Sequence, residues 1–232
     1  MNEHSLHSAI KGWYSVPGDK SEVKVDDFII DIARGAFLIE IQTGNFSAVK
    51  RKLTTLVKNH AVRLVYPIPE RKWIVRVTET GEIVSRRKSP RKGRPVDLFY
   101  ELVSIPNLIN HENFSLEVLM IDEEEIRCND GKGSWRRKGV SIKDSVLINV
   151  NSKLLFKEKE DFLMFLPDNL KRTFTSQGLA DLTGVSIHLA RKMAYCLTKM
   201  GLIANVGKNG RKLTFQKTLS KDPGAKQNMV SM

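Results

Sequence analysis

Asp31, Glu40 and Gln42 stand close together in the segment FIIDIARGAFLIEIQ, residues 28–42. The two apolar runs of this segment predict two β-strands, and Gly35 between them supplies a residue suited to a tight turn. Glu40 and Gln42 are two residues apart, so they share one face of their strand, and the turn brings Asp31 back beside them. The hairpin is therefore expected to gather two carboxylates and an amide on one face.

Two carboxylates held together repel each other unless a cation neutralises them. Asp31 and Glu40 lie within strongly apolar runs, where an uncompensated charge is costly. Oxygen ligands favour a hard divalent cation, Mg²⁺ or Mn²⁺, which activates a water and stabilises charge on a phosphate. The pattern predicts a metal-dependent hydrolytic site. The alternative is an ordinary hairpin whose polar face meets solvent.

The next segments predict the elements that position this hairpin. Residues 46–59 have apolar side chains at helical spacing, with Asn45 as N-cap, and predict an amphipathic helix. Residues 61–69 predict a third strand, which Pro67 and Pro69 are expected to stop. The order strand, strand, helix, strand indicates an α/β sheet.

Further elements follow along the chain. Residues 72–87 predict a hairpin that turns near Gly81, and residues 114–127 predict a strand that enters an acidic turn. Pro95 is expected to start a helix that ends at Pro106. A short helix is expected at the very beginning of the chain.

This region resembles the PD-(D/E)XK nuclease superfamily over about residues 1–127. The resemblance rests on the spacing D-IARGAFLI-E-I-Q and on the strand, strand, helix, strand order. It implies a restriction-endonuclease-like mixed sheet with flanking helices, expected over residues 1–150, and the hydrolysis of phosphodiester bonds. Ile30 stands where the family has the proline before its aspartate, and Gln42 stands where most members have lysine and some have glutamine.

The resemblance also implies roles for single residues. The metal ligands that it implies are Asp31, Glu40 and the peptide carbonyl of Ile41. Gln42 takes the third catalytic position but carries no charge, so Lys50 on the following helix is expected to replace the missing lysine. Glu3, on the opening helix, is a candidate for the extra acidic residue of some members.

The chain has a formal net charge of +12 and a pI of about 9.7, which point to a polyanionic partner. Nucleic acid is the first expectation, and an anionic membrane surface is the alternative. Residues 86–94 form a basic run broken by Pro and Gly, expected to be a loop that either stays solvated or contacts phosphates. Residues 131–139, GKGSWRRKG, predict a second basic loop. The candidate DNA-binding residues of the first loop are Arg86, Arg87, Lys88, Arg91, Lys92 and Arg94.

Other functional classes receive no support from the sequence. No apolar run approaches the roughly 18 residues of a membrane span, and the first residues lack the apolar region of a signal peptide. Cys128 and Cys196 are isolated, so neither a disulfide framework nor a zinc site is expected. We expect a cytoplasmic protein, nucleoid-associated in a prokaryote, that makes no membrane contact.

The C-terminal third changes character. Residues 158–172 predict one helix. Thr175 and Ser186 are expected to cap two further helices, which Gly184 and Gly201 end. A hairpin that turns at Lys208-Asn209-Gly210 follows, and residues 218–232 are expected to be disordered.

This order resembles the winged helix-turn-helix family over about residues 159–217, assigned here to a domain of residues 155–217. The motifs are LADLTGVSIHLARKMAYCLTKMGLI and GKNGRK. The apolar positions expected to face inward are Ala180, Val185, Ala190, Met193 and Leu197. The resemblance implies that the third helix enters the major groove and that the hairpin contacts the backbone. The DNA-binding residues that it implies are Ser186, His188, Arg191 and Lys192 on the helix, and Lys208, Arg211 and Lys212 on the hairpin.

Taken together, these features predict a metal-dependent DNA endonuclease that its winged helix targets to double-stranded or branched DNA, with a homodimer as one arrangement. The alternative is a non-catalytic DNA-binding regulator whose nuclease-like domain is inactive. An RNA-processing factor is a third interpretation, although the sequence carries no RNA-specific motif.

Overall fold

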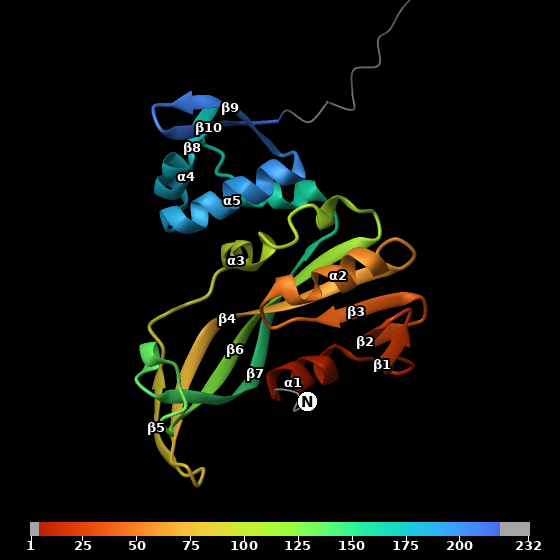
Figure 1. Ribbon diagram of the computed structural model, residues 1–232, viewed down its shortest axis with the longest axis vertical. Coiled ribbons are helices and arrows are strands. Elements are labelled where there is room, and N and C mark those ends of the chain that lie inside the picture. The colour runs from red at the N-terminus through yellow and green to blue at the C-terminus, as the bar shows by residue number, and fades with distance from the viewer. Residues whose placement is uncertain (1–4, 219–232) are drawn as a thin grey trace, which may run out of the picture.

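The computed structural model describes residues 5–218 and has a mixed α/β fold with two β-sheets (Figure 1). A large mixed sheet is built from residues 20–156, and a small antiparallel sheet lies in the C-terminal part. Glu3 and residues 219–232 of the tail that is expected to be disordered lie outside the described residues. Among the described helices, none is long and apolar enough to cross a membrane.

The large sheet has the order β1-β2-β3-β4-β6-β7, and β5 pairs with the far half of β4. β3, β4 and β6 run parallel to one another, while the other neighbours run antiparallel. The parallel pairs need crossover connections, which the helices between these strands provide. The strands are β1 (Lys20–Val25), β2 (Phe28–Arg34), β3 (Phe37–Ile41), β4 (Ala61–Val77), β5 (Ile83–Lys88), β6 (Phe114–Asn129) and β7 (Val140–Phe156).

Helices cover both faces of this sheet. On one face, α2 (Phe46–Leu56) and α3 (Phe99–Leu102) contribute buried side chains to the main apolar cluster. On the other face, α1 (Ser5–Tyr14) places Leu6 and Ile10 in a second cluster with isoleucines of β2 and β3. Fully burying one such side chain stabilises the fold by about 2 kcal/mol. These contacts fix α1 against the two strands that carry Asp31 and Glu40.

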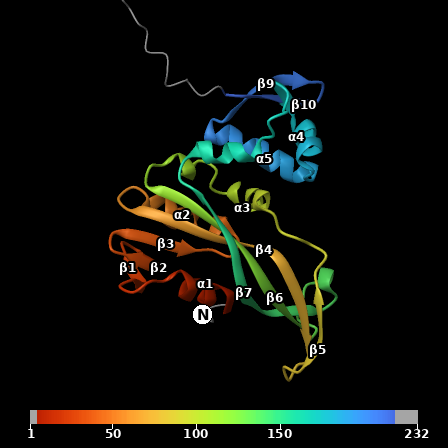
Figure 2. The same ribbon diagram turned by 180° about the vertical axis from the view of Figure 1, so that it is seen from behind.

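β4, β6 and β7 continue beyond the helices as a curved extension, which β5 completes. Figures 1 and 2 show it projecting away from the body of the protein on the side opposite the C-terminal sheet. We call residues 71–88 and 122–149 the arm. Its strands pair β4 with β5 and β6, and β6 with β7.

The expectation that Pro67 and Pro69 stop the third strand is wrong, because β4 runs through both. The pairing of β4 with β3 ends at Val65, and its pairing with β5 begins at Trp73. Between these points β4 has a strand neighbour only on the β6 side. Proline lacks an N–H and is tolerated where a strand edge is unpaired, which explains its position here.

Two further predictions of loops are corrected. The acidic residues 122–125 lie within β6 and not in a turn, because basic side chains of the neighbouring strands pair with them. Arg86, Arg87 and Lys88 belong to β5, so only the segment from Ser89 to Arg94 is a loop. The hairpin turn near Gly81 is confirmed, and Gly81 has a φ of 94°.

Two predicted helices differ from the sequence expectation. Pro95 starts a 3-10 turn that leads into α3, which ends at Leu102 and not at Pro106. The segment from Lys159 to Phe165 is 3-10 and not α-helical, and its Phe162 packs against Phe156 and Phe99.

The C-terminal unit combines two helices with the small sheet. Its elements are β8 (Thr173–Thr175), α4 (Ser176–Thr183), α5 (Ile187–Met200), β9 (Ile203–Asn209) and β10 (Lys212–Lys217), and the sheet order is β8-β10-β9. Its buried side chains, among them Leu189 and Met193, belong to the same apolar cluster as α2 and α3. The C-terminal unit is therefore packed on the large sheet through a continuous core.

The predicted helix ends in this unit are confirmed. The Thr175 hydroxyl accepts a hydrogen bond from the Gly178 N–H, and the Ser186 hydroxyl accepts one from the Leu189 N–H. Gly184 and Gly201 end their helices with φ of 64° and 80°. Asn45, by contrast, precedes α2 in a left-handed conformation without capping it through its side chain.

Candidate active site

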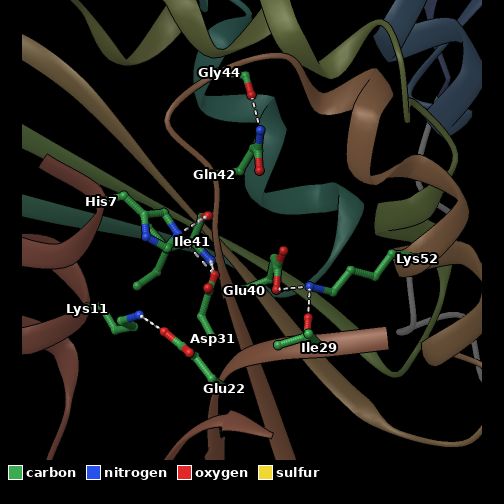
Figure 3. Close-up of polar contacts among 10 residues, drawn as sticks. All are labelled: His7, Lys11, Glu22, Ile29, Asp31, Glu40, Ile41, Gln42, Gly44 and Lys52. Carbon is green, nitrogen blue, oxygen red and sulfur yellow. Dashed lines mark hydrogen bonds and ion pairs between the residues drawn. The ribbon is translucent and has the colours of Figure 1, made fainter. Parts of the chain in front are cut away.

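β2 and β3 pair only from Ile32 to Arg34 and from Phe37 to Ile39. Beyond that point the strands separate, and the Asp31 carboxylate takes the place of a backbone partner. Its Oδ2 accepts the Ile41 N–H at 2.8 Å. The structure therefore brings Asp31, Glu40 and the Ile41 peptide together at the opening between the two strands (Figure 3).

His7 of α1 joins this group, although the sequence reasoning missed it. Its Nε2 lies 3.3 Å from Asp31 Oδ2 and 3.1 Å from the Ile41 carbonyl oxygen. His7 follows the buried Leu6 and precedes Ile10 by one helical turn, so it lies on the side of α1 that faces the sheet. That spacing is the signal in the sequence that locates it.

Glu40 lies on the α2 side of the opening and is 6% exposed. Lys52 of α2 places its Nζ 2.5 Å from Glu40 Oε2 and also donates to the Ile29 carbonyl. The expectation that Lys50 reaches the site is wrong. Residues two positions apart in an α-helix differ by about 200° around its axis. Lys50 therefore points away from Glu40 and lines a separate surface hollow beside Pro106.

The two carboxylates have opposite pKa shifts. Burial and the nearby charge of Asp31 raise the pKa of Glu40 to about 7, although Lys52 acts to lower it. For Asp31, burial acts to raise the pKa, but hydrogen bonds from His7 and the Ile41 N–H outweigh it and lower the pKa below the usual range. Such a pair holds one permanent negative charge and one group that takes up a proton near neutral pH.

Gln42 does not join the carboxylates. Its side-chain amide donates to the Gly44 carbonyl. Figure 3 shows Gln42 pointing toward Gly44 and away from Asp31 and Glu40. The third position of the expected motif therefore stabilises the turn into α2, and the positive charge near Glu40 comes from Lys52.

Two oxygen atoms of this site converge. The Ile41 carbonyl and Asp31 Oδ2 both contact the single nitrogen His7 Nε2, so they face one common point. Within residues 5–218, no group of three or more His, Cys, Asp or Glu side chains is arranged to hold a metal ion. A cation here would depend on a peptide carbonyl as well as on two carboxylates, a mixed oxygen set that suits Mg²⁺.

A cleft of about 760 Å³ begins beside this site. Leu6 and Thr43, the chain neighbours of His7 and Gln42, line one end of it. The cleft continues along the inner side of the arm, past Lys72 and Arg127, and Arg91 and Gly93 of the 89–94 loop form part of its wall. Its lining mixes cations with carboxylates, and Asp31 and Glu40 are not part of it.

The predicted basic residues of β5 and its loop are all exposed. Arg86 pairs with Glu124 at 2.5 Å, and both Arg86 and Lys88 lie over the ring of Trp73. Of the predicted loop residues, Arg91 lines the cleft. The exposed residues of this region that the sequence singled out are Arg86, Arg87, Lys88, Arg91, Lys92 and Arg94.

On α5, the predicted DNA-binding residues divide into two groups. Arg191 is exposed, and Ser186 serves as the N-cap. Lys192 is half-buried, which corrects the expectation that it points outward: its Nζ lies 3.4 Å from the Tyr100 carbonyl oxygen. His188 stacks on the Tyr100 ring at a centroid distance of 6.2 Å. On the hairpin of β9 and β10, the exposed basic residues are Lys208, Arg211 and Lys212.

Comparison with known proteins identifies relatives of this chain. A family model described as a domain of unknown function (DUF8091) matches residues 4–157, which hold the large sheet and the carboxylate site. An uncharacterized protein of Treponema pallidum (strain Nichols) is 31% identical over 216 residues, covering 93% of this chain and 85% of that protein. No solved structure matches the chain.

Proposed function

We propose that this chain, which belongs to the family described as a domain of unknown function (DUF8091), is a metal-dependent DNA endonuclease. The observation that carries the proposal is the meeting of Asp31, Glu40 and the Ile41 peptide at the opening between β2 and β3. The order β2, β3, α2, β4 around that opening supports a PD-(D/E)XK nuclease-like fold.

Asp31, Glu40 and the Ile41 carbonyl are the residues that would hold Mg²⁺ or Mn²⁺. Bound there, the ion supplies a Lewis acid that lowers the pKa of a water and offsets charge on the phosphate. Burial and, after it, the charge of Asp31 raise the pKa of Glu40, and a cation bound beside both carboxylates would favour the ionised form of Glu40.

Lys52 takes the position that the family's lysine fills from β3. It holds an ammonium group against Glu40 at the side of the site next to α2. His7 holds Asp31 and the Ile41 carbonyl from the α1 side. Arg91, exposed on the 89–94 loop, contacts the phosphates of the DNA strand.

We further propose that the C-terminal unit is a winged helix that holds DNA. The succession of α4, α5 and the β9–β10 hairpin supports this, as do the exposed cations on both. Lys192 is half-buried against Tyr100, so the predicted cations that remain exposed on these elements are Arg191, Lys208, Arg211 and Lys212.

The test of the enzyme is cleavage of supercoiled plasmid and of a branched duplex with Mg²⁺ or Mn²⁺. Asp31→Asn and Glu40→Gln are expected to lower the rate at least about a hundredfold, since several kcal/mol of transition-state stabilisation depend on the site. DNA binding, measured by electrophoretic shift, is expected to persist in both variants.

Two lysines of α2 provide a matched pair for this experiment. Lys52→Met is expected to lower the cleavage rate at least about tenfold, because it removes the positive charge beside Glu40. Lys50→Met on the other side of the helix is expected to leave the rate within twofold, about the scatter of such comparisons. Protein that cuts neither DNA and binds neither ion by calorimetry, yet still binds DNA, is the non-catalytic regulator.

A further inference from the structure

The loop between β6 and β7, residues 131–139, exposes an aromatic side chain at the end of the arm. We call this loop the knuckle. Trp135 is 83% exposed, more than any other large apolar side chain among the described residues. The Trp135 ring is therefore open to contact by a ligand.

The backbone of the knuckle holds Trp135 outward. The Gly133 N–H donates to the Gly139 carbonyl at 2.9 Å, and the Lys138 N–H donates to the Trp135 carbonyl at 3.0 Å. A Cβ on Gly133 would lie 1.9 Å from the Val140 carbonyl oxygen, so the two ends of the loop cross too closely for any side chain there. The knuckle is thus a closed loop of defined shape, and Trp135 sits in its short 3-10 turn.

The knuckle is also strongly basic. Its four cationic residues are exposed, and within the described part of the chain none has a carboxylate partner. In the strands of the arm, by contrast, Arg71, Lys72 and Arg127 are all paired with carboxylates. The Arg136 guanidinium lies 5.8 Å from the centroid of the Trp135 ring. The four cations are Lys132, Arg136, Arg137 and Lys138.

We propose that Trp135 stacks on an unpaired nucleobase while the knuckle cations bind the flanking phosphates. A flat aromatic ring beside unpaired cations is the arrangement that binds single-stranded nucleic acid. Bases inside a blunt duplex have both faces covered by their neighbours, whereas an overhang or a gap presents a free face. Trp135 is the only large apolar side chain of the knuckle, which disfavours insertion into a lipid surface.

This inference rests on the proposed function and deepens it, because it names the DNA structure that the endonuclease recognises: a duplex with an unpaired strand. Binding is therefore measured in EDTA, where no cleavage occurs. If the protein never cleaves DNA but still requires Trp135 for overhang binding, the enzyme proposal fails and this one stands. If cleavage is observed without that requirement, this one fails alone.

The experiment compares two fluorescently labelled probes by anisotropy: a blunt duplex and the same duplex with a single-stranded thymidine overhang. Trp135→Ala is expected to weaken binding of the overhang probe about tenfold and to leave the blunt duplex within twofold. Trp13→Ala is the control, because Trp13 is 46% exposed and also lies near a lysine, but on α1. Equal loss on both probes, or no loss on either, overturns the proposal.

A second measurement uses the protein with Trp13→Phe and Trp73→Phe, which leaves Trp135 as the sole tryptophan. Its emission is expected to be quenched by the overhang probe and unchanged by the blunt duplex, since stacking requires an accessible base. A blue shift with vesicles of phosphatidylserine and phosphatidylcholine, without quenching by DNA, overturns the proposal in favour of a lipid surface.

Discussion

In the arm, the residues Asp122, Glu123 and Glu125 are buried as deeply as Glu40 in the candidate site, at 4, 3 and 6% exposed against 6%. The difference lies in what surrounds them. Lys72 Nζ lies 2.7 Å from Glu123 and 2.9 Å from Glu125.

Arg71 and Arg127 complete this set by pairing with Asp122 and Glu125. In the site, Asp31 and Glu40 share one lysine and an imidazole.

The pKa shifts follow this balance. In the arm, burial acts to raise the pKa of Asp122 and Glu125, but Arg71, Lys72 and Arg127 outweigh it and the pKa of both falls. In the site, burial and Asp31 together raise the pKa of Glu40 to about 7. A buried carboxylate in an apolar strand is thus no sign of a site by itself. The excess of negative over positive charge distinguishes the site from the arm.

The largest expected effect tests the balance between buried carboxylates and cations in the arm. Lys72→Met leaves Glu123 and Glu125 buried with fewer cations, and we expect it to lower the free energy of unfolding by about 3 kcal/mol. Urea denaturation followed by circular dichroism measures the loss. Lys24→Met, at an exposed position of β1, is the control and is expected to cost less than about 0.5 kcal/mol. Equal losses in both variants would show that the arm pairs are not energetically coupled.

The second prediction is that removing a carboxylate charge changes stability in opposite directions in the two regions. Glu40 titrates at about 7 when folded, above its ordinary 4.5, so the stability that its neutral form provides is complete below pH 4.5 and is lost as the pH rises through 7. Glu40→Gln is therefore expected to make the protein about 1–2 kcal/mol more stable at pH 8 in EDTA, and to flatten this pH dependence.

Glu125→Gln is the matched variant in the arm. Its folded pKa is lowered, so removing the charge is expected to destabilise the protein by about 1–2 kcal/mol at the same pH. Thermal melts of both variants from pH 4 to 8 check the pair. If both substitutions change stability in the same direction, charge balance does not distinguish the site from the arm.

Features that depend on residues close together in the chain could be predicted from the sequence, whereas features that depend on remote residues could not. The caps at Thr175 and Ser186 and the turn at Gly35 depend on residues within one helical turn or one hairpin, and these predictions agree with the structure. The two strands that carry Asp31 and Glu40 were likewise visible as short apolar runs.

The errors concern partners that are remote in the chain. The sequence predicts a turn at the acidic stretch of β6 because the counter-ions Arg71 and Lys72 lie about fifty residues earlier, on a strand that runs through two prolines. The spacing of Leu6 and Ile10 places His7 on the side of α1 that faces the sheet, but its contact with Asp31 depends on the packing of α1 across that sheet. Lys52 differs from Lys50 only in helical phase, and that phase is fixed by which face of α2 is buried.

The third prediction concerns the effect of Mg²⁺ on stability and compares one variant in the site with one in the arm. Because the site has excess negative charge, Mg²⁺ at ten times its dissociation constant is expected to stabilise the protein by about 1.4 kcal/mol, which raises the melting temperature by about 3–6 °C. Asp31→Asn is expected to abolish this shift, whereas Asp122→Asn is expected to retain it in full. An unchanged shift in Asp31→Asn would place the ion elsewhere and contradict the assignment of the site.

The smallest expected effect separates burial from pairing within the arm itself. Arg86 and Glu124 form an ion pair as short as those around Lys72, but their side chains are 49% and 28% exposed. Water screens an exposed pair, so Arg86→Met is expected to lower the free energy of unfolding by less than about 1 kcal/mol, including the loss of the Trp73 contact. Urea denaturation beside Lys72→Met provides the comparison. A loss as large as that of Lys72→Met would mean that exposed and buried ion pairs stabilise the arm equally. The balance of buried charges would then not distinguish the arm from the site. A small loss leaves burial as the reason why each arm carboxylate needs its cation, and it supports the proposal that the incompletely balanced pair at Asp31 and Glu40 binds one.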